Sequence, residues 1–247
     1  MPSPSSSPTH KSSIRTKVWS SLRKVALPDS RFHHTYSSFI ADFHGSSSAT
    51  SLLTSLPCYQ NANTIFIAPD NCIQELRFRA LRDGKTVLVT TYGIRRGFWV
   101  LDPRSIAEEK WEMASLLDGM ERLGRHVTLA EIQKMGKIDL MVTGTGAINH
   151  QGLRFGKGHG FFDLEWAMLY EIGVVGKSTQ TVAVVHECQV LYEELRGEEV
   201  IEVEGASKPG CGILWDRLEE GMLEDIEPLR ELKDGRNWTK ERIGTEH

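Results

Sequence analysis

The chain has 247 residues, of which 40% are hydrophobic and 25% are charged, a balance typical of a globular domain. Its formal net charge of −4 argues against a general nucleic-acid-binding protein, and no apolar run approaches the roughly 20 residues of a membrane-spanning helix. The four cysteines form no CxxC pair, which argues against a zinc site and a disulfide framework. We therefore expect neither a membrane nor a nucleic acid as partner.

Three parts of the chain differ in composition. Residues 1–10 are rich in serine and proline and are expected to be a disordered tail. Residues 11–220 carry the regular apolar patterns of one α/β domain, and residues 221–247 are a highly charged segment, expected to be a helix with a loose end. The serine-rich start contains no apolar signal-peptide core, but it leaves a mitochondrial transit peptide as an alternative to a cytoplasmic location.

Helices and strands are predicted to alternate along the domain. Apolar residues at helical spacing predict a helix over 13–26, and serine caps predict a short helix over 46–56. The elements that follow are predicted from apolar runs, helical spacing and glycine stops: strand 64–69, helix 71–84, strand 85–93, helix 105–124, strand 137–148, helix 161–173, and strands 180–191 and 198–205. Apolar strands between helices imply a mainly parallel sheet covered on both faces. We therefore expect a three-layer αβα fold that is Rossmann-like.

Ligands in such open sheets bind beyond the carboxyl ends of the strands, so the loops that follow the predicted strands are candidate site segments. Arg95 and Arg96 are candidates for binding an anionic substrate group, with a surface salt bridge as the alternative. His186 is a further substrate candidate, with a hydrogen-bonded structural role as the alternative. Asp70 and Asn71 are expected to cap the helix that follows them, although they could also belong to a substrate wall.

The most unusual segment is RFGKGHGFFD, residues 154–163, in which three glycines alternate with a lysine and a histidine before a predicted helix. Glycine lets backbone N–H groups approach an anion closely, and the helix N-terminus adds a partial positive charge. Arg154 and Lys157 add full positive charges, and Asp163 could hold a metal ion. These features favour a site for nucleotide phosphates. The alternative is a flexible loop with solvated side chains.

The sequence LRFGKGHGFFD resembles the nucleotide loop of the 5-formyltetrahydrofolate cyclo-ligases, which are also called methenyltetrahydrofolate synthetases. The segments IDLMVTGTGAINHQG and VAVVHECQVL, and KSSIR near the N-terminus, fit the same family. TTYGIRRGF and KPGCGILWDRL resemble a divergent branch, the methenyltetrahydrofolate synthetase domain-containing proteins. The resemblance spans about residues 11–217.

This resemblance implies an ATP- and Mg²⁺-dependent ligase that transfers a phosphoryl group to a formyl or amide oxygen and then closes a ring. In the family's pattern, Arg154 and Lys157 would act in catalysis, and Arg15 would reach both ATP and substrate. Asp163 would bind Mg²⁺, with Glu202 as a loosely matching second ligand. Because the N-terminal cations would have to be retained, we expect a cytoplasmic location. The residues implied to surround ATP are Lys11, Arg15, Arg154, Gly156, Lys157, Gly158, His159, Gly160, Phe161 and Phe162.

One departure from the family pattern concerns the substrate. In the family's ordinary members a Pro–x–Glu segment supplies a glutamate that holds the pterin-type ring, and residues 45–71 contain no such glutamate. Three functions therefore stay open. They are the folate cyclo-ligase itself, the same ATP-driven cyclodehydration on a non-folate substrate, and a non-catalytic nucleotide- or RNA-associated binding protein with the same fold. The sequence leaves the oligomeric state open.

Overall fold

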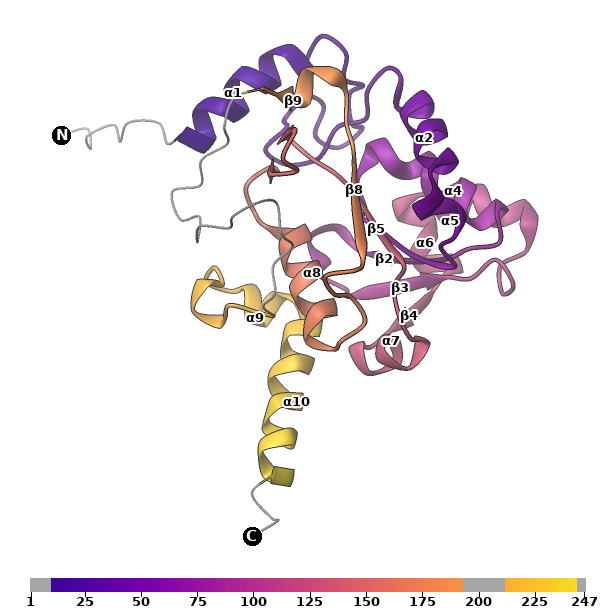
Figure 1. Cartoon of the computed structure of the whole chain (residues 1–247), viewed down its shortest axis with the longest axis vertical. Coiled ribbons are helices and arrows are strands. Elements are labelled where there is room, and N and C mark those ends of the chain that lie inside the picture. The colour runs from indigo at the N-terminus through magenta and orange to yellow at the C-terminus, as the bar shows by residue number, and fades with distance from the viewer. Residues whose placement is uncertain (1–9, 193–211, 244–247) are drawn as a thin grey trace, which may run out of the picture.

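A six-stranded sheet forms the centre of the computed structural model, which describes residues 10–192 and 212–243. Its strand order is β4–β3–β2–β1–β5–β8 (Figure 1). The four strands β2, β1, β5 and β8 are parallel, and β3 and β4 continue the sheet antiparallel at one edge. The strands are β1 (Thr64–Ile67), β2 (Thr86–Thr90), β3 (Phe98–Leu101), β4 (Arg125–Val127), β5 (Leu140–Gly144) and β8 (Gln180–Val184).

Burial on both faces explains why the central strands are apolar runs without alternation. All five residues of β5 are buried, and the same holds for the last three residues of β1 and the last four of β2. Ile65 lies at the centre of this core, because it pairs with Val87 on one side and with Leu140 on the other. A strand shielded from water on both faces needs apolar side chains throughout. The predicted mainly parallel sheet is thereby confirmed.

Helices cover both faces of the sheet. α4 (Gln74–Arg82) connects β1 to β2, and α8 (Phe161–Glu171) connects β5 to β8. These two connections step in opposite directions along the sheet, so right-handed crossovers place their helices on opposite faces (Figure 1). α2 (Ser46–Ser55) and α5 (Trp111–Ser115) contact α4, whereas α7 (Leu129–Met135) and α10 (Glu227–Ile243) contact each other, and α10 also contacts α8. The α/β fold with three αβα layers is as predicted.

The segment between β2 and β5 differs from its prediction. A single helix was expected over 105–124, but the chain forms α5 and α6 (Leu117–Leu123), separated by Leu116 in an extended conformation. The strands β3 and β4 and the helix α7 were not predicted at all. β3 has four residues, the edge strand β4 has three and α7 has seven, so each carries too little periodic pattern to be recognised from sequence.

A second, three-stranded sheet with the order β7–β6–β9 was also not predicted. It consists of β6 (Ala147–Asn149), β7 (Arg154–Phe155) and β9 (Val190–Leu191), so the predicted strands 137–148 and 180–191 each divide between two sheets. The first helix, α1 (His10–Leu22), begins three residues earlier and ends four residues earlier than predicted, and it contacts β6. The small sheet thus brings the N-terminal helix to the hairpin that leads into the glycine-rich segment. The predicted strand 198–205 lies outside the described residues.

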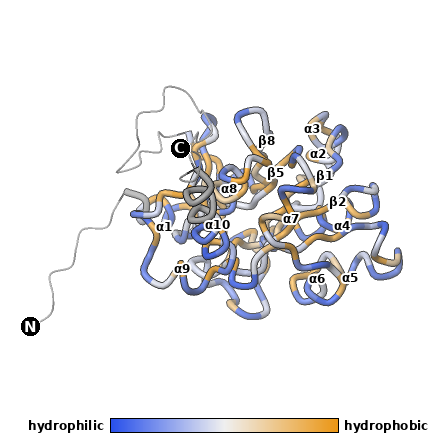
Figure 2. The backbone as a smooth tube through the Cα atoms, turned by 90° about the horizontal axis from the view of Figure 1, so that it is seen from below, coloured by the Kyte–Doolittle hydropathy of each residue, from blue (hydrophilic) through white to orange (hydrophobic). Residues whose placement is uncertain are grey.

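The C-terminal part packs onto the domain through its first turns. After α9 (Met222–Asp225), the side chains of Ile226, Leu229 and Leu232 are buried. Figure 2 shows hydrophilic segments mainly in the outer loops and helices, around a more hydrophobic centre. Within residues 10–192 and 212–243, no helix combines the length and the apolar character needed to cross a bilayer. The short helix α3 (Pro57–Gln60) lies between α2 and β1 in the chain.

Candidate functional site

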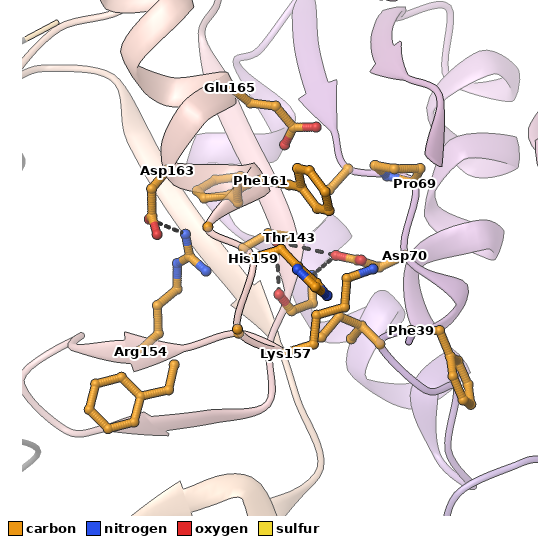
Figure 3. A pocket seen from close by; sticks show the side chains of 18 of the residues that line it. Phe39, Pro69, Asp70, Thr143, Arg154, Lys157, His159, Phe161, Asp163 and Glu165 are labelled. Carbon is orange, nitrogen blue, oxygen red and sulfur yellow. Dashed lines mark hydrogen bonds and ion pairs between the residues drawn. The ribbon is translucent and has the colours of Figure 1, made fainter. Parts of the chain in front are cut away.

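A cavity of about 440 Å³ lies beyond the carboxyl ends of β1 and β5 (Figure 3). These two neighbouring strands are followed by connections that leave in opposite directions, so the cavity occupies the point where the strand order reverses. Open α/β sheets bind ligands at this position, because the diverging loops leave a crevice there. Its walls come from Ala68–Asn71 after β1, from Thr143 and Gly144, from Tyr92 and Gly93, and from residues 153–163.

The structure brings most of the predicted nucleotide residues together around this single cavity. The ones that line it are Arg15, Arg154, Gly156, Lys157, Gly158, His159, Gly160, Phe161, Phe162 and Asp163. Arg15 comes from α1 and the others from the continuous segment that runs from β7 through the glycine-rich loop into the first turn of α8, so two segments far apart in the chain meet here. Their individual roles stay predictions, but their common location is a property of the structure.

The glycine-rich segment leaves the N-terminus of α8 open. Gly158 has φ +131° and Gly160 has φ +66°, conformations that residues with a Cβ atom rarely adopt. Gly160 is also the N-cap of α8, and within the described part of the chain no side chain caps the first N–H groups of that helix. The residues at the start of this eleven-residue helix line the cavity, so its uncapped N–H groups suit an anion there.

Arg15 holds the glycine-rich segment against α1. Its Nε donates a hydrogen bond of 3.0 Å to the carbonyl oxygen of Gly156. Burial lowers the pKa of the Arg15 guanidinium, but from a value so high that it stays charged at neutral pH. A Cβ atom on Gly158 would lie 4.0 Å from this guanidinium, so the segment passes close to the cation. Arg15 also lines the cavity, where its positive charge suits an anion.

Arg154 and Asp163 form an ion pair across the start of α8, with 2.7 Å between Nη2 and Oδ1 (Figure 3). The Arg154 guanidinium lies 4.3 Å from the ring centre of Phe162, which fixes its plane. The two partners differ in exposure: the side chain of Arg154 is 16% exposed and that of Asp163 is 78% exposed. Asp163 is therefore the more accessible partner, open to a further ligand from the solvent side.

Lys157 reaches across the cavity to the loop before α2. Its Nζ donates a 3.0 Å hydrogen bond to the carbonyl oxygen of Ser38 and lies 4.3 Å from the ring centre of Tyr92. Burial lowers the pKa of Lys157, while the negative charges of Asp70 and Glu165 act in the opposite direction. A half-desolvated ammonium group binds an incoming anion more strongly than a solvated one, because less water has to be removed.

Two further carboxyl groups line the cavity, of which Asp70 was expected first as a helix cap and Glu165 was not predicted at all. Asp70 was expected to cap the following turn, Asn71–Ile73, but its side chain makes no capping bond. Instead its Oδ2 accepts hydrogen bonds from the backbone N–H of Gly144 (2.7 Å) and from Thr143 Oγ1 (3.2 Å), which joins the ends of β1 and β5. The capping prediction was therefore wrong, and the alternative place in a cavity wall is the one the structure has.

The second carboxyl group belongs to Glu165, which is only 2% exposed and accepts a hydrogen bond from Thr90 Oγ1. Burial raises the pKa of Glu165 to about 8, and the nearby charge of Asp70 adds to this effect. The signal that could have found Glu165 is an acidic residue within an otherwise buried, apolar stretch of α8, since Leu164, Trp166 and Met168 are core residues. Glutamate is seldom fully buried without a specific role.

Arg31 also lines the cavity and was not predicted. Its backbone N–H and guanidinium hydrogen-bond to Asp29, which in turn accepts a 2.7 Å bond from Asn71 Nδ2. Burial alone would raise the pKa of Asp29, but these hydrogen bonds outweigh it and lower the pKa to about 2. Asp29 thus stays ionised and anchors the loop that presents Arg31.

The predicted substrate residues Arg95, Arg96 and His186 do not line the cavity. Arg96 pairs with Glu121 on the surface, with 2.6 Å between Nη2 and Oε1, and Arg95 is exposed. His186 Nδ1 accepts the backbone N–H of Cys188, so the ring caps a short turn. For Arg96 and His186 the geometry matches the structural alternative, whereas Arg95 is only exposed, and the proposed substrate contacts of all three stay predictions without geometric support.

The metal site stays a prediction. Glu202 lies outside the described residues, and the side chain of Lys11, which is in α1, lies outside the described part as well. Within the described ranges, no group of three or more His, Cys, Asp or Glu side chains could hold a metal ion. Asp163 is the one predicted metal ligand that the structure places, beside the cavity and paired with Arg154.

Comparison with known proteins places the chain among folate-related proteins. A model of the 5-formyltetrahydrofolate cyclo-ligase family matches residues 7–196. The methenyltetrahydrofolate synthase domain-containing protein of Mus musculus is 31% identical over 242 residues, covering 91% of this chain and 63% of that protein. Its counterpart in Homo sapiens is 30% identical over 241 residues, covering 90% of this chain and 61% of that protein.

The chain therefore spans less than two thirds of the length of these curated relatives. Among solved structures, the NMR structure of Aquifex aeolicus 5,10-methenyltetrahydrofolate synthetase aligns with a TM-score of 0.44 at 16% identity, covering 76% of this chain and 84% of that one. The family match extends over most of the described residues and includes every segment that forms the cavity. The chain belongs to the 5-formyltetrahydrofolate cyclo-ligase family.

Proposed function

We propose that this protein is an ATP- and Mg²⁺-dependent cyclo-ligase, which activates a formyl or amide oxygen by phosphoryl transfer and then closes a ring. The observation that carries the proposal is the meeting of Arg15 and Lys157 with the open N-terminus of α8 in one cavity, inside the region matched by the family model. Three independent sources of positive potential face the same space, and a polyphosphate is the ligand that such a space accepts best.

The residues fit a nucleotide in size as well as in charge. The cavity volume of about 440 Å³ lies in the range typical of small-molecule sites. The conformations at Gly158 and Gly160 keep Cβ atoms away from the anion side of the segment. The phosphates would lie on this segment between Arg15 and Lys157. Mg²⁺ commonly binds through one or two carboxylates together with phosphate oxygens, and Asp163 would supply the carboxylate.

The chemistry asks the protein for charge neutralisation and positioning rather than for a nucleophile. ATP would transfer its γ-phosphoryl group to the formyl or amide oxygen and leave as ADP, and intramolecular attack on the activated carbon would close the ring as the C–O bond breaks and phosphate leaves, so correct orientation lowers the barrier. Lys157 would neutralise charge on the group being transferred, because its ammonium group is already half-desolvated. Arg154 would hold Asp163 in place at the start of α8. The predicted site residues contain no Ser–His–Asp motif, which agrees with a reaction that needs no nucleophile from the protein.

The direct test is an assay of the purified protein with ATP, Mg²⁺ and 5-formyltetrahydrofolate, which follows the absorbance of the methenyl product together with ADP release. We expect both signals, and we expect Asp163→Asn to abolish both while a non-hydrolysable ATP analogue still binds without Mg²⁺. ADP release that requires a different formamide or amide would favour the non-folate alternative. A protein that binds no ATP analogue at all would contradict the proposal.

A further inference from the structure

A further cation, Arg31, lines the cavity and comes from the loop of residues 29–40. It lies in a tight turn, because Asp29 and His33 pair backbone to backbone with N–O distances of 2.9 and 2.8 Å. The side chain of Arg31 is 43% exposed, and Phe39 and Ile40 from the same loop line the cavity with it. The loop is far from the glycine-rich segment in the chain, so it brings a cation to the cavity independently.

Asp29 holds the Arg31 guanidinium by one edge. Its carboxylate accepts hydrogen bonds from Nε at 3.4 Å and from Nη2 at 3.3 Å, and Asn71 and the backbone N–H of Phe32 anchor it. The side chain of Asp29 is 4% exposed and is not among the residues that line the cavity. Within the described part of the chain, Nη1 of Arg31 makes neither a hydrogen bond nor an ion pair. An arginine held in this way can use its remaining N–H groups to bind an anion.

Two aromatic rings fix the position of the Arg31 guanidinium. Its central carbon lies 5.2 Å from the ring centre of Phe32 and 5.8 Å from that of Tyr92, and these two rings are stacked with 27° between their planes. The hydroxyl group of Tyr92 donates a hydrogen bond to the carbonyl oxygen of Ser38, which ties this ring to the same loop. A guanidinium group held by a carboxylate and by aromatic faces loses little conformational freedom when it binds an anion.

Tyr92 also brings Arg31 close to Lys157. The Nζ atom of Lys157 lies 4.3 Å from the centre of the same ring, and it donates to the same carbonyl oxygen of Ser38. Burial is the main cause of the lowered pKa of Lys157, and the positive charge of Arg31 lowers it further. Asp70, which Figure 3 shows beside Lys157, acts in the opposite direction. Two cations at one ring repel each other, and a ligand anion that contacts both would offset this repulsion.

We propose that Arg31 binds the terminal phosphoryl group of the nucleotide together with Lys157, and that it is a catalytic residue of the phosphoryl transfer. The inference rests on the proposed function, in which the phosphates lie between Arg15 and Lys157. Arg15 holds Gly156 at the α1 side, whereas Arg31 adjoins Lys157 at Tyr92, which is the end where the transferred group would lie.

The role of Arg31 in the transfer is electrostatic. Its N–H groups would donate hydrogen bonds to oxygens of the terminal phosphoryl group while that group passes from ADP to the acceptor oxygen. Arg31 gives up no proton, because a guanidinium stays charged at neutral pH. Charge on these oxygens is stabilised most where cations are already in position, so the preorganised Arg31 would lower the barrier to transfer.

A second Asp–x–Arg pair on the surface provides a matched control for Arg31. Arg104 donates to Asp102 through its backbone N–H, Nε and Nη2, at 2.9, 2.9 and 2.8 Å. Arg31 uses the same three groups toward Asp29. The side chain of Arg104 is 81% exposed and is not among the residues that line the cavity. The local pairing is therefore the same in both places, whereas the position at the cavity belongs to Arg31.

The test compares two nucleotides that differ in the terminal phosphate: a non-hydrolysable ATP analogue and ADP. Binding of each to the full chain is measured by calorimetry without Mg²⁺, so that the terminal phosphate gains its contacts from the protein and not from the metal. We expect the wild type to bind the ATP analogue about tenfold or more tightly than ADP, because charge-assisted hydrogen bonds hold the extra phosphate. Equal affinities would overturn the proposal without recourse to any variant.

Arg31→Met then assigns the preference to one side chain, because methionine has neither the charge nor the N–H donors. We expect the preference for the ATP analogue to shrink to about threefold or less, while the affinity for ADP stays within about twofold. A purely structural role of Arg31 in its loop would weaken both nucleotides together. Arg31→Gln, which keeps N–H donors for Asp29 but has no charge, should show the same loss. Arg104→Met breaks the surface pair and should retain the full preference.

Retention of the full preference in both Arg31 variants would overturn the assignment. It would also be overturned if these variants weakened binding of 5-formyltetrahydrofolate alone, since Arg31 would then bind a carboxylate of the second substrate. The two proposals fail in distinguishable ways. A wild type that binds neither nucleotide contradicts the nucleotide function, whereas a wild type that prefers the ATP analogue without the help of Arg31 contradicts only the present inference. Far-ultraviolet circular dichroism of all variants checks that they are folded before the affinities are compared.

Discussion

The central sheet is more deeply buried than the small sheet. In the central sheet, β5 is buried along its whole length and belongs to a core that includes both helical layers. The small sheet has strands of only two or three residues, and its core consists of Ile14, Val18, Ala147 and Leu191 with Phe155 beside them. The first sheet supplies most of the stability, whereas the second places Arg15 and the glycine-rich segment.

This difference has a general consequence for the cavity. Its floor is carried by the deeply buried sheet, and its cationic wall is carried by a lightly buried one. Changes in the two sheets should therefore separate stability from ligand affinity. The predictions below test that separation, beginning with the largest expected effect.

The largest expected effect is on stability and comes from the central sheet. Leu88 in β2 is fully buried and lies outside the cavity lining, so Leu88→Ala leaves a hole in the core. We expect a loss of about 2–5 kcal/mol in the free energy of unfolding, measured by urea denaturation. The affinity of the folded fraction for an ATP analogue should stay unchanged. Val18→Ala, in the small core, is the matched substitution, and it should cost less stability but weaken the analogue's binding.

The next largest effect is on nucleotide affinity. Arg15→Met removes a charged donor that touches Gly156 and faces the cavity. Loss of a charge-assisted contact to phosphate should weaken binding of the ATP analogue by about 10–100-fold, with little change in the urea midpoint. Lys24→Met, which removes an exposed cation just after α1, is the control. Equal effects of the two substitutions would show that only the net charge matters.

A smaller effect concerns pH and comes from Lys157. Because burial lowers its pKa, Lys157 loses its proton at a lower pH than the ordinary value of 10.5. As the pH rises through this lowered pKa, the ammonium charge disappears and the affinity for the ATP analogue should fall. Titration of the affinity between neutral and alkaline pH in wild type and Lys157→Met checks this. The variant should bind more weakly and lack that alkaline step.

The lowered pKa of Lys157 makes stability change with pH in the opposite direction to nucleotide affinity. Between the lowered pKa and 10.5, the folded protein binds fewer protons at Lys157 than the unfolded chain does. The contribution of Lys157 to the free energy of unfolding therefore rises with pH across this window, while nucleotide affinity falls. Urea denaturation of the wild type and Lys157→Met across the window should reveal a difference with this slope. A difference that declines with pH would contradict the lowered pKa.

The smallest expected effect belongs to Arg96. Its guanidinium is 64% exposed and paired with Glu121 on the surface, away from the residues that line the cavity. Exposed pairs of this kind contribute about 0–1 kcal/mol, so Arg96→Ala should barely change the urea midpoint. It should also leave the affinity for ATP analogue and substrate unaltered. A tenfold loss of substrate affinity would restore the predicted substrate role of Arg96.

Much of the fold could be predicted because its signals are local. The buried strands β1, β2 and β5 stand out as apolar runs, and Gly84 and Gly173 mark the ends of α4 and α8, which lead from β1 to β2 and from β5 to β8. The β6–β7 hairpin could not be predicted, because strands of three and two residues hold too little pattern. For the same reason, the sequence predicted one strand over 137–148, where the structure has β5 in the central sheet followed by β6 in the small sheet.

The glycine-rich wall of the candidate site was predictable, and the carboxyl groups beside it were not. The spacing in residues 154–163 identified Arg154, Lys157 and Asp163 by residue type and by the glycines between them. Asp70 and Glu165 carry no such pattern, because their importance comes from burial and from partners on other elements. His186 and Arg96 were chosen by their positions at strand ends, but local partners draw their side chains away from the cavity.

The sequence by itself determined the strand–helix alternation, the glycine-rich segment and the family to which the chain belongs. Periodicity and backbone conformation depend on neighbours in the chain, so they can be recognised without a structure. Only the tertiary structure decided that Arg15 meets Gly156 across 141 residues and that Glu165 meets Thr90 across 75. Contacts over such distances depend on how sheets and helices pack, and they are the contacts that make the basic glycine-rich segment one wall of the cavity.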